Sequence, residues 1–475
     1  MVAIQSYIHG ATADHGGDAL PVVSPVDLSV TGQLLDAPAE VVDRAVQDCR
    51  QAWLAARRST VAERVAWLNR AADAIEVQAG ELVGLIVRDI GKPRRAAAFE
   101  VGRAAQFVRA AAVQVQTLGG ETLPLDAAAA GAGRLGYTRR IPYGVVAAIT
   151  PFNAPINLLV QKVAPALAAG NGVVVKAHPA GTRTALAVAR IFAESGLPAG
   201  LFNVVTGDRA PAQALASHPD VAVVTFTGGT RAGEALIRAA GARKFVAELG
   251  SNAANVVLDD ADLGDAAVRI AAAAFEASGQ QCVSAQRVIV MEKAYDEFLA
   301  RFVQAAQALR TGDPDDPKTD LGPMVSLAQA ERVMDMAQQA VAQGGRYALE
   351  PRRQDCTVSP GILADVPRSA AIWCDEVFGP LAVVERAADV DEALRLANDS
   401  PFGLQGAVFT RDMARALRFA DEFDVGSLWV NEASRFRLDI YPFGGVKQSG
   451  FGREGVRYAI EELSQLKFVG IRPAP

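Results

Sequence analysis

The sequence predicts an α/β protein of two or three domains, one of which contains a doubly wound parallel sheet. Its 475 residues are too many for a single hydrophobic core, and 50% of them are hydrophobic, which is enough for several cores. From Gly144 onward, apolar strands alternate with helical stretches, as expected for parallel strands joined by helices. A second alternation begins near residue 249 and indicates another α/β unit.

The first part of the chain, residues 41–118, is predicted to be helical. Its apolar residues recur at steps of three and four. The strands expected next lie within residues 144–149, 170–178, 201–207 and 221–229, with helices over residues 182–195 and 231–240. We therefore expect residues 1–121 and 143–248 to form one nucleotide-binding unit.

The second unit is expected to span residues 249–440. Its strands are predicted within residues 254–262, 284–292, 380–387, 403–410 and 426–431, and a helix over residues 294–309. These strands are apolar and short, and turn residues separate them. The pattern is that of a second sheet covered by helices.

Composition excludes several classes of function. The chain has 47 Lys and Arg against 53 Asp and Glu, with no long run of like charges, so we expect no binding to nucleic acid. No apolar run approaches 18 residues, and the first residues do not resemble a signal peptide, so we expect no membrane span and a cytoplasmic location. The four Cys and four His show no metal-ligand spacing, so neither a disulfide framework nor a metal site is expected.

One thiol and one carboxylate are candidates for catalysis. Cys282 lies in a stretch of small and polar residues, FEASGQQCVSAQR, and Glu248 follows an apolar strand earlier in the chain. A turn that presents a thiol, with a carboxylate offered from a strand end, can place a nucleophile beside a general base. The ordinary alternatives are a buried apolar Cys and a solvated Glu. The polar neighbours Gly279, Gln280 and Gln281 favour the turn over the core.

Asn153 is the third candidate. The strand at residues 144–149 is followed by Thr150-Pro151-Phe152-Asn153-Ala154-Pro155. Prolines cannot continue a central strand, so the chain must turn and present Asn153 at the carboxyl end of the strand, where ligands bind in open α/β sheets. Its amide can donate to an oxygen on which negative charge develops. The alternative is an Asn that caps the following helix.

With these three segments, the chain resembles the aldehyde dehydrogenase superfamily over nearly its whole length. Further segments typical of that family are Val173–Lys176, Phe226–Gly228, Asp375–Pro380 and Pro442–Gly450. The resemblance implies a Rossmann-like cofactor domain (residues 1–121 and 143–248), an α/β catalytic domain (249–440), and small β oligomerisation segments (122–142 and 441–475). It also implies an active site between the two domains and a homodimer or homotetramer.

The same resemblance implies oxidation of an aldehyde to a carboxylic acid with NAD or NADP. Cys282 would attack the aldehyde carbon, and the Asn153 amide and the Cys282 N–H would bind the oxyanion. After transfer of a hydride ion to the cofactor, Glu248 would activate the water that hydrolyses the thioester. No metal is implied.

The cofactor site departs from the family pattern at one point. Where many members carry a carboxylate that binds the adenosine ribose, the run Lys176-Ala177-His178-Pro179 has none, so we expect NADP to be accepted, alone or alongside NAD. His178 is either a phosphate contact or a residue of a surface turn. The cofactor residues implied by the resemblance are Thr150, Pro151, Phe152, Lys176, His178, Pro179, Gly228, Gly229, Gly233, Leu249, Glu376 and Phe378.

The substrate residues implied by the resemblance are Phe152, Gln281, Val283, Arg437 and Phe443. The segment Asn431–Asp439 resembles a branch that oxidises lactaldehyde and small anionic aldehydes. Members that oxidise doubly charged aldehydes tend to carry Arg where this chain has Gln281, so we expect a small aldehyde with a hydroxyl, monoanionic or aromatic tail. Arg437 either contacts this substrate or forms an ion pair with Asp439 or a neighbouring loop.

The sequence disfavours three other functions. A cysteine hydrolase would need a His to activate the thiol, and no His has such a context. A CoA-acylating semialdehyde dehydrogenase generally lacks the general-base Glu, which is present here. A non-catalytic structural relative would be free to lose Cys282 or Asn153, and both are retained.

Overall fold

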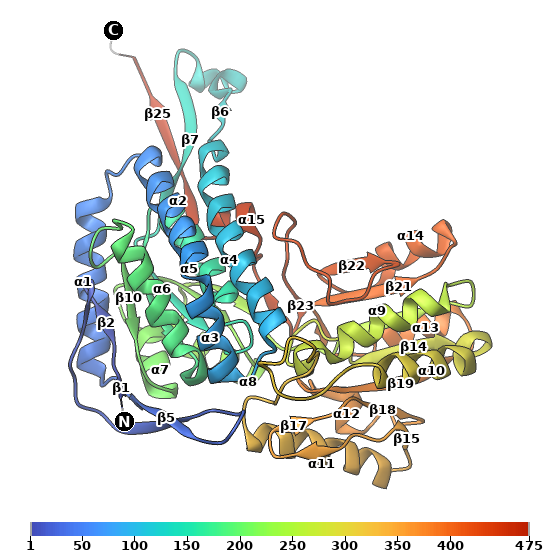
Figure 1. Cartoon of the computed structure of the whole chain (residues 1–475). Coiled ribbons are helices and arrows are strands. Elements are labelled where there is room, and N and C mark those ends of the chain that lie inside the picture. Colours follow the sequence, from blue (N-terminus) through green and yellow to red (C-terminus); the bar gives the residue numbers. More distant parts are fainter. Residues whose placement is uncertain (1, 474–475) are drawn as a thin grey trace.

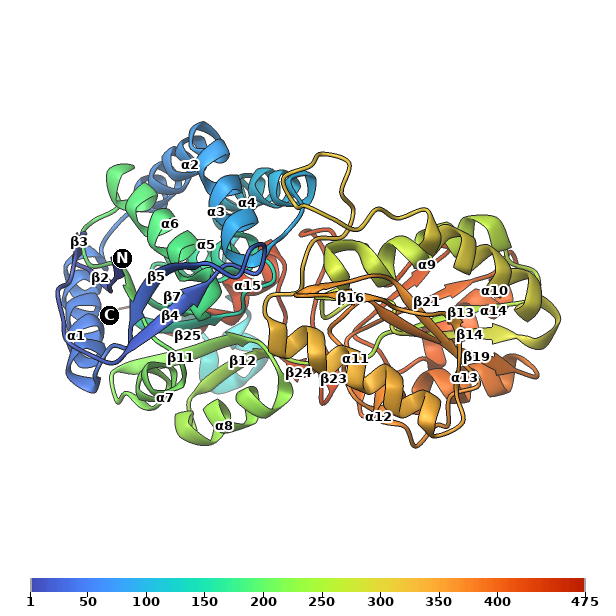
Figure 2. The ribbon, with the colours of Figure 1, turned by 60° about the horizontal axis from the view of Figure 1, so that its bottom comes forward.

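The computed structural model describes residues 2–473, which form two α/β units lying side by side and a projecting β-arm (Figures 1 and 2). The sheet of the first unit has the strand order β24-β12-β11-β8-β9-β10-β2-β3. Its strands are β2 (Tyr7–Ile8), β3 (Ala11–Thr12), β8 (Val145–Thr150), β9 (Gly172–Ala177), β10 (Phe202–Val205), β11 (Val221–Thr227), β12 (Lys244–Glu248) and β24 (Gly450–Phe451). Strands β8 to β12 are parallel, so the predicted doubly wound sheet is present.

Helices cover both faces of this sheet. One face is covered by α1 (Ala39–Ala56), α7 (Arg209–Ser217) and α8 (Thr230–Ala240). The other is covered by α2 (Val61–Val77), α3 (Ala79–Ile90), α4 (Arg94–Gln114), α5 (Asn157–Ala168), α6 (Thr182–Glu194) and α15 (Val456–Glu462). Alternate residues of β8 therefore enter two separate cores, which is why its sequence is continuously apolar.

The second unit repeats this plan with the strand order β15-β18-β19-β14-β13-β21-β22. Its strands are β13 (Ala254–Val257), β14 (Arg287–Met291), β15 (Arg346–Leu349), β18 (Gly361–Ala364), β19 (Leu381–Ala387), β21 (Gln405–Phe409) and β22 (Ser427–Val430). Its helices are α9 (Leu263–Phe275) and α10 (Glu292–Gln307) on one face, and α11 (Leu327–Ala342), α12 (Ala371–Cys374), α13 (Val390–Asn398) and α14 (Met413–Glu422) on the other.

The β-arm is an antiparallel sheet that extends away from both units (Figure 1). It consists of β6 (Thr122–Leu123), β7 (Leu135–Pro142) and β25 (Ser464–Ile471). The remaining strands form small sheets: β1 (Ala3–Ile4), β4 (Ala19–Val23) and β5 (Val30–Leu35); β16 (Arg353–Gln354) with β17 (Thr357–Val358); and β20 (Phe402–Gly403) with β23 (Val446–Lys447).

The predicted fold class is confirmed by these sheets, while the domain boundaries stay a prediction. One connection was not anticipated: β24 belongs to the C-terminal segment, yet it pairs with β12 and completes the first sheet. Within residues 2–473, no helix is both long and apolar enough to cross a bilayer. In the same range, no group of three or more His, Cys, Asp or Glu side chains is placed to hold a metal ion.

The junction of β24 with β12 yields a prediction about stability. Gly450 has φ +120°, and a Cβ there would lie 1.9 Å from the main-chain oxygen of Ala247. We expect Gly450→Ala to lower the free energy of unfolding by at least about 2 kcal/mol, because both the backbone and β12 must shift. Urea unfolding measures the change.

The matched control is Gly102→Ala, inside helix α4, where nothing lies within 4 Å of an added Cβ. This substitution should stabilise the protein by about 1 kcal/mol. A similar loss of stability in both variants would contradict the proposed cause.

Candidate active site

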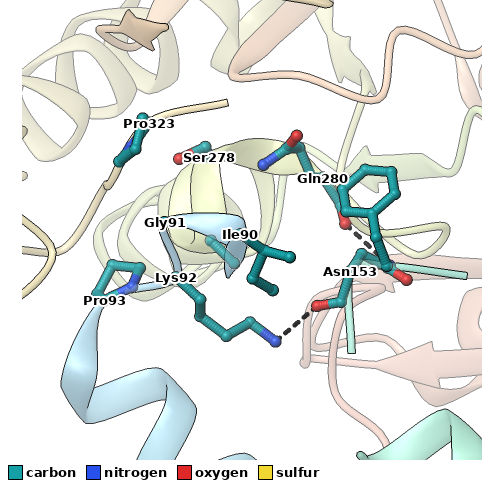
Figure 3. A pocket seen from close by; sticks show the side chains of 10 residues that line it. Ile90, Gly91, Lys92, Pro93, Asn153, Ser278, Gln280 and Pro323 are labelled. Atoms are coloured by element: carbon teal, nitrogen blue, oxygen red, sulfur yellow. Dashed lines mark hydrogen bonds between the residues drawn. The ribbon is translucent and has the colours of Figure 1, made fainter. Parts of the chain in front are cut away.

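The turn that carries Asn153 joins the two units. Strand β8 ends at Thr150 and helix α5 begins at Asn157, so residues 151–156 turn at the carboxyl edge of the first sheet. The Asn153 side chain reaches the second unit, where its Nδ2 donates a hydrogen bond to the main-chain oxygen of Gln280 at 2.9 Å (Figure 3). Asn153 is therefore bonded to the main chain of Gln280, which lies two residues before the candidate nucleophile Cys282.

The loop that presents Cys282 has a constrained backbone. Ala277, Ser278 and Gly279 are three consecutive residues with positive φ, at 52°, 57° and 64°. The Ser278 hydroxyl donates to the Gly322 oxygen at 2.7 Å, and Gln280 Oε1 accepts from the Val325 N–H at 3.0 Å. Strained conformations of this kind persist only where the surroundings hold them, and they cluster at functional sites.

The thiol of Cys282 lies in a small apolar cluster with Val283, Leu404, Phe443 and Tyr441. The residue as a whole is half-buried, but the protein around its sulfur displaces water. This desolvation raises the pKa of the thiol to about 12; the Arg437 guanidinium opposes the rise, and neighbouring carboxyl groups add to it. In this state Cys282 is a neutral thiol that needs a base or a change of surroundings to become a nucleophile.

Glu248 is the last residue of β12, and its side chain points into the protein. The residue is 2% exposed, and neither carboxyl oxygen has a hydrogen-bond partner within residues 2–473. Burial, and after it the negative charge of Glu454, raises the pKa of Glu248 well above its usual value. The carboxyl group is close enough to Cys282 to help raise the pKa of that thiol.

Glu454 lies between two buried cations. It pairs with Lys162 and with Arg437, each at 2.9 Å. Burial opposes the ionisation of Glu454, but the attraction of the two cations is stronger and lowers its pKa to about 2. The Arg437 guanidinium also lies 3.6 Å from the centre of the Phe443 ring, which packs against Cys282.

The Arg437 side chain is therefore buried in this cluster, and its ion-pair partner lies in a neighbouring loop, between β24 and α15, and is not Asp439. Asp439 instead accepts two hydrogen bonds from Arg103, at 2.9 and 2.6 Å. Besides Glu454, Arg437 Nη2 donates to Gln161 Oε1 at 3.0 Å, while its Nε is buried with no partner in the described part of the chain. One N–H of the guanidinium is thus not used by any residue of the range 2–473.

The other candidate substrate residue with a polar side chain, Gln281, is already engaged. Its Oε1 accepts from Arg435 Nε at 3.0 Å, and Arg435 also pairs with Glu276. Val283 and Phe443 are buried beside the thiol, whereas Phe152 lies on the cofactor side of the turn.

The predicted cofactor residues gather at the carboxyl ends of parallel strands. Thr150 ends β8, Lys176 lies at the end of β9, and Gly228 and Gly229 follow β11. Helix α8 begins at Thr230, and its N-cap, Gly229, makes no side-chain capping bond. Nothing lies within 4 Å of a Cβ built on Gly229, so the N-terminal N–H groups of α8 can be approached by a phosphate.

Gly233 and Leu249 pack together: a Cβ on Gly233 would lie 2.4 Å from Leu249 Cδ2. Helix α8 can approach the end of β12 this closely only because residue 233 is a glycine. From the second unit, Glu376 accepts a hydrogen bond from the Ser251 N–H at 3.0 Å, and burial raises its pKa to about 7 despite that bond.

The Phe152 ring links both units, since its centre lies 5.0 Å from that of His178 and 5.8 Å from that of Phe378. His178 Nδ1 accepts from the Ala180 N–H at 3.2 Å and so caps the short helix Pro179–Gly181. Burial lowers the pKa of His178 to about 4 and that of Lys176 to about 8. The imidazole is therefore neutral, with a capping role.

Sequence reasoning missed Lys162 and Glu454. A signal for Lys162 exists, because it lies in the helix NLLVQKVAPALA, all of whose residues are buried. A lysine in such a helix requires a buried anion. Glu454 has a weaker signal, as a carboxylate in the glycine-containing run FGREG (residues 451–455), which directly follows the last family segment.

Comparisons with known proteins agree with this geometry. A model of the aldehyde dehydrogenase family matches residues 12–469. A 3-sulfolactaldehyde dehydrogenase of Priestia aryabhattai is 40% identical over 408 residues, which is 86% of each chain. The NADP complex of the NADP-dependent glyceraldehyde-3-phosphate dehydrogenase of Bacillus halodurans superposes with a TM-score of 0.96 at 31% identity, covering 99% of both chains.

The NAD-dependent aldehyde dehydrogenase of Sinorhizobium meliloti superposes with a TM-score of 0.95 at 33% identity, covering 100% of this chain and 96% of that one. Similarity of this extent, in sequence and in structure, covers both α/β units and the β-arm. The chain therefore belongs to the aldehyde dehydrogenase family, as an NAD(P)-dependent aldehyde dehydrogenase.

Proposed function

We propose that Cys282 is the nucleophile, Glu248 the general base and Asn153 an oxyanion donor in the oxidation of an aldehyde to a carboxylic acid. The observation that carries this proposal is Glu248. A buried carboxyl group with two unpartnered oxygens costs stability, and such groups are found where a reaction uses them. The nearby thiol of Cys282 and the amide of Asn153 supply the other two functions.

The residues act in sequence. Cys282 first loses its proton to solvent; the thiolate then attacks the carbonyl carbon, and the second N–H of Asn153 Nδ2, together with the Cys282 N–H, stabilises the oxyanion. Bound NAD(P) supplies the acceptor for the hydride ion that leaves this carbon. Glu248 then takes a proton from the water that attacks the thioester, and the acid is released.

The cofactor site fits this role. The open space at Gly229 and the free N–H groups of α8 suit a pyrophosphate, and Glu376 is placed to accept from a ribose hydroxyl. Pro179 offers no carboxylate against a 2′-phosphate, which supports the use of NADP as well as NAD.

We further propose a short aldehyde with a hydroxyl or monoanionic tail as substrate. The Arg437 guanidinium, whose charge reaches the Cys282 thiol, has an Nε–H with no partner among residues 2–473, and the relative of 40% identity is named a 3-sulfolactaldehyde dehydrogenase. Because Arg437 is shared with Glu454, one negative charge on the substrate fits better than two.

The β-arm supports a homodimer or homotetramer. Its strand β25 exposes Leu466 and Phe468, which are 61% and 52% accessible, and exposed strands of this kind are commonly covered by a second chain. We propose the domain division 1–121 with 143–248, and 249–440; of the segments 122–142 and 441–475, the strands of the β-arm would bridge subunits, while β24 and α15 belong to the first unit. A catalytic thiol fits a reducing compartment, which supports a cytoplasmic location.

The base role of Glu248 is tested by Glu248→Gln. If Glu248 activates only the deacylating water, the variant should release about one equivalent of reduced cofactor per site and then stall, with turnover at least about 100-fold below wild type. Stopped-flow absorbance measures the burst, and mass spectrometry should find an acyl group on Cys282.

The matched control is Cys282→Ala, which should give no burst, no adduct and less than about 1% of wild-type turnover. Normal steady-state turnover of Glu248→Gln without an acyl adduct would require another base.

The raised pKa of Glu248 also predicts how stability depends on pH. Above pH 4.5 the unfolded chain releases this proton while the folded protein keeps it, so the wild type loses stability as pH rises toward the folded pKa. Glu248→Gln removes this loss. We expect its Tm to exceed that of the wild type at pH 8 and to match it near pH 4.

The control removes the exposed carboxylate Glu234 by Glu234→Gln. A Tm difference for Glu248→Gln that does not grow with pH, or that resembles the Glu234→Gln difference, would show that burial of Glu248 does not oppose its ionisation.

The substrate proposal is tested at Arg437. Arg437→Met leaves Glu454 paired with Lys162, so the fold should survive. We expect KM to rise at least about tenfold for a short aldehyde with a terminal carboxylate, the value of one charge-assisted hydrogen bond, and to change little for an uncharged aldehyde of equal length.

Arg103→Met is the control, because Arg103 holds the same loop through Asp439. Equal losses for both aldehydes in Arg437→Met, with a lowered Tm, would assign Arg437 to the scaffold.

A further inference from the structure

We propose that Lys92 and Glu100, a buried ion pair of the first unit, are positioning residues that hold Asn153 in line with Cys282. This inference rests on the proposed role of Asn153 as an oxyanion donor. Neither residue touches the thiol. They act through the turn between β8 and α5, and both lie outside the segments that identified the family.

Lys92 binds the main chain of Asn153, whose side-chain amide is the proposed oxyanion donor. It lies between helices α3 and α4, and its Nζ donates to the main-chain oxygen of Asn153 at 2.6 Å (Figure 3). The same Nζ pairs with Glu100 Oε2 at 2.5 Å. The two side chains are only 9% and 6% exposed, so water does not screen this pair and the bonds are charge-assisted.

Glu100 binds the other end of the turn, at the start of helix α5. Its second oxygen, Oε1, accepts the N–H groups of Ile156 at 3.0 Å and Asn157 at 3.2 Å, where helix α5 begins. These N–H groups have no partner inside the helix, and a carboxylate there is favoured by the helix dipole. The ion pair thus holds the segment from Asn153 to Asn157 at both ends, across Pro155, which has no N–H to contribute.

The side chain of Asn153 faces the nucleophile loop. Its Nδ2 donates one N–H to the main-chain oxygen of Gln280 at 2.9 Å, and its Oδ1 is buried without a partner among the described residues. The second N–H of Nδ2 remains for an oxyanion. The direction of this second N–H depends on the position of the turn, because Asn153 Oδ1 has no hydrogen-bond partner among residues 2–473.

A small pocket gives the turn room to move. It is bordered by Lys92 and Asn153 on one side and by Ser278 and Gln280 on the other (Figure 3). Without the Lys92 ammonium, the Asn153 carbonyl loses its partner, and the turn can shift into this space. A displacement of about 1 Å at a catalytic donor can cost about 100-fold in rate.

The test combines two substitutions. We expect Lys92→Met, which keeps the length of the side chain, to lower kcat about 100-fold while the KM values for aldehyde and cofactor change less than about threefold. Asn153→Ala removes the amide but keeps the main-chain oxygen that Lys92 binds. In that background, Lys92→Met should lower kcat less than about threefold, although it lowers the Tm as much as in the wild type.

A purely structural role predicts the same factor in kcat in both backgrounds, and that result would overturn the proposal. So would a kcat of Lys92→Met within threefold of wild type. If Lys92→Met does not fold, Glu100→Gln serves in its place, because it removes the charge but keeps an acceptor for α5. Its loss of kcat should be smaller and should again vanish in the Asn153→Ala background.

Arg183→Met is the matched control. Arg183 pairs with the buried Asp89 at 2.6 Å in the same helical layer, and its side chain bonds to Asp89 and Thr31 rather than to the turn at residues 151–156. Its loss should lower the Tm and leave kcat within twofold. A wild-type kcat in Asn153→Ala alone would instead refute the proposed function of Asn153, so the two failures are distinguishable.

Discussion

The active site depends on the pairing of Glu454 with both nearby cations. Lys162 and Arg437 each lie 2.9 Å from this carboxylate, inside the protein. If Glu454 were absent, Glu248 would be an anion available to these cations, since the charges of both already lower its pKa. An ion pair with these cations would keep Glu248 ionised and lower its pKa, so it would be a weaker base toward water. Glu454 thus keeps both oxygens of Glu248 free at the cost of burying three charges together.

This arrangement also separates the proposed activity from its alternatives. A cysteine hydrolase needs an imidazole at the thiol, but His9 and His218 pair with Asp48 and Asp43, and His15 bonds to Ser6. The fourth, His178, caps a short helix on the cofactor side. A non-catalytic relative would have no reason to keep an unpartnered buried carboxyl group. The same group argues against a CoA-acylating enzyme, in which water is not activated.

The sequence predicted the features that depend on a few consecutive residues. The strand that ends in two prolines, the polar loop around Cys282 and the strand that ends at Glu248 each carry their own local chemistry, and the structure has the corresponding elements. The partners of buried charges could not be predicted. For Arg437 the sequence suggested Asp439 or a neighbouring loop, without naming the residue of that loop; packing brought Arg103 of helix α4 to Asp439 and Glu454 to Arg437. Such pairings are decided by which helices meet, and adjacency in the sequence does not reveal them.

The closure of the first sheet by β24 has a consequence for synthesis on the ribosome. Strand β12 gains its outer neighbour, and Lys162 its anion, only when residues 450–454 emerge. Lys162 and Glu454 are 292 residues apart, so at ordinary translation rates the lysine waits roughly 15 to 60 seconds for its partner. During that time the nascent first unit has an open edge, and Lys162 lacks Glu454, the carboxylate with which it pairs in the folded protein. Co-translational folding can therefore prepare this unit but complete it only after residues 450–454 have left the exit tunnel.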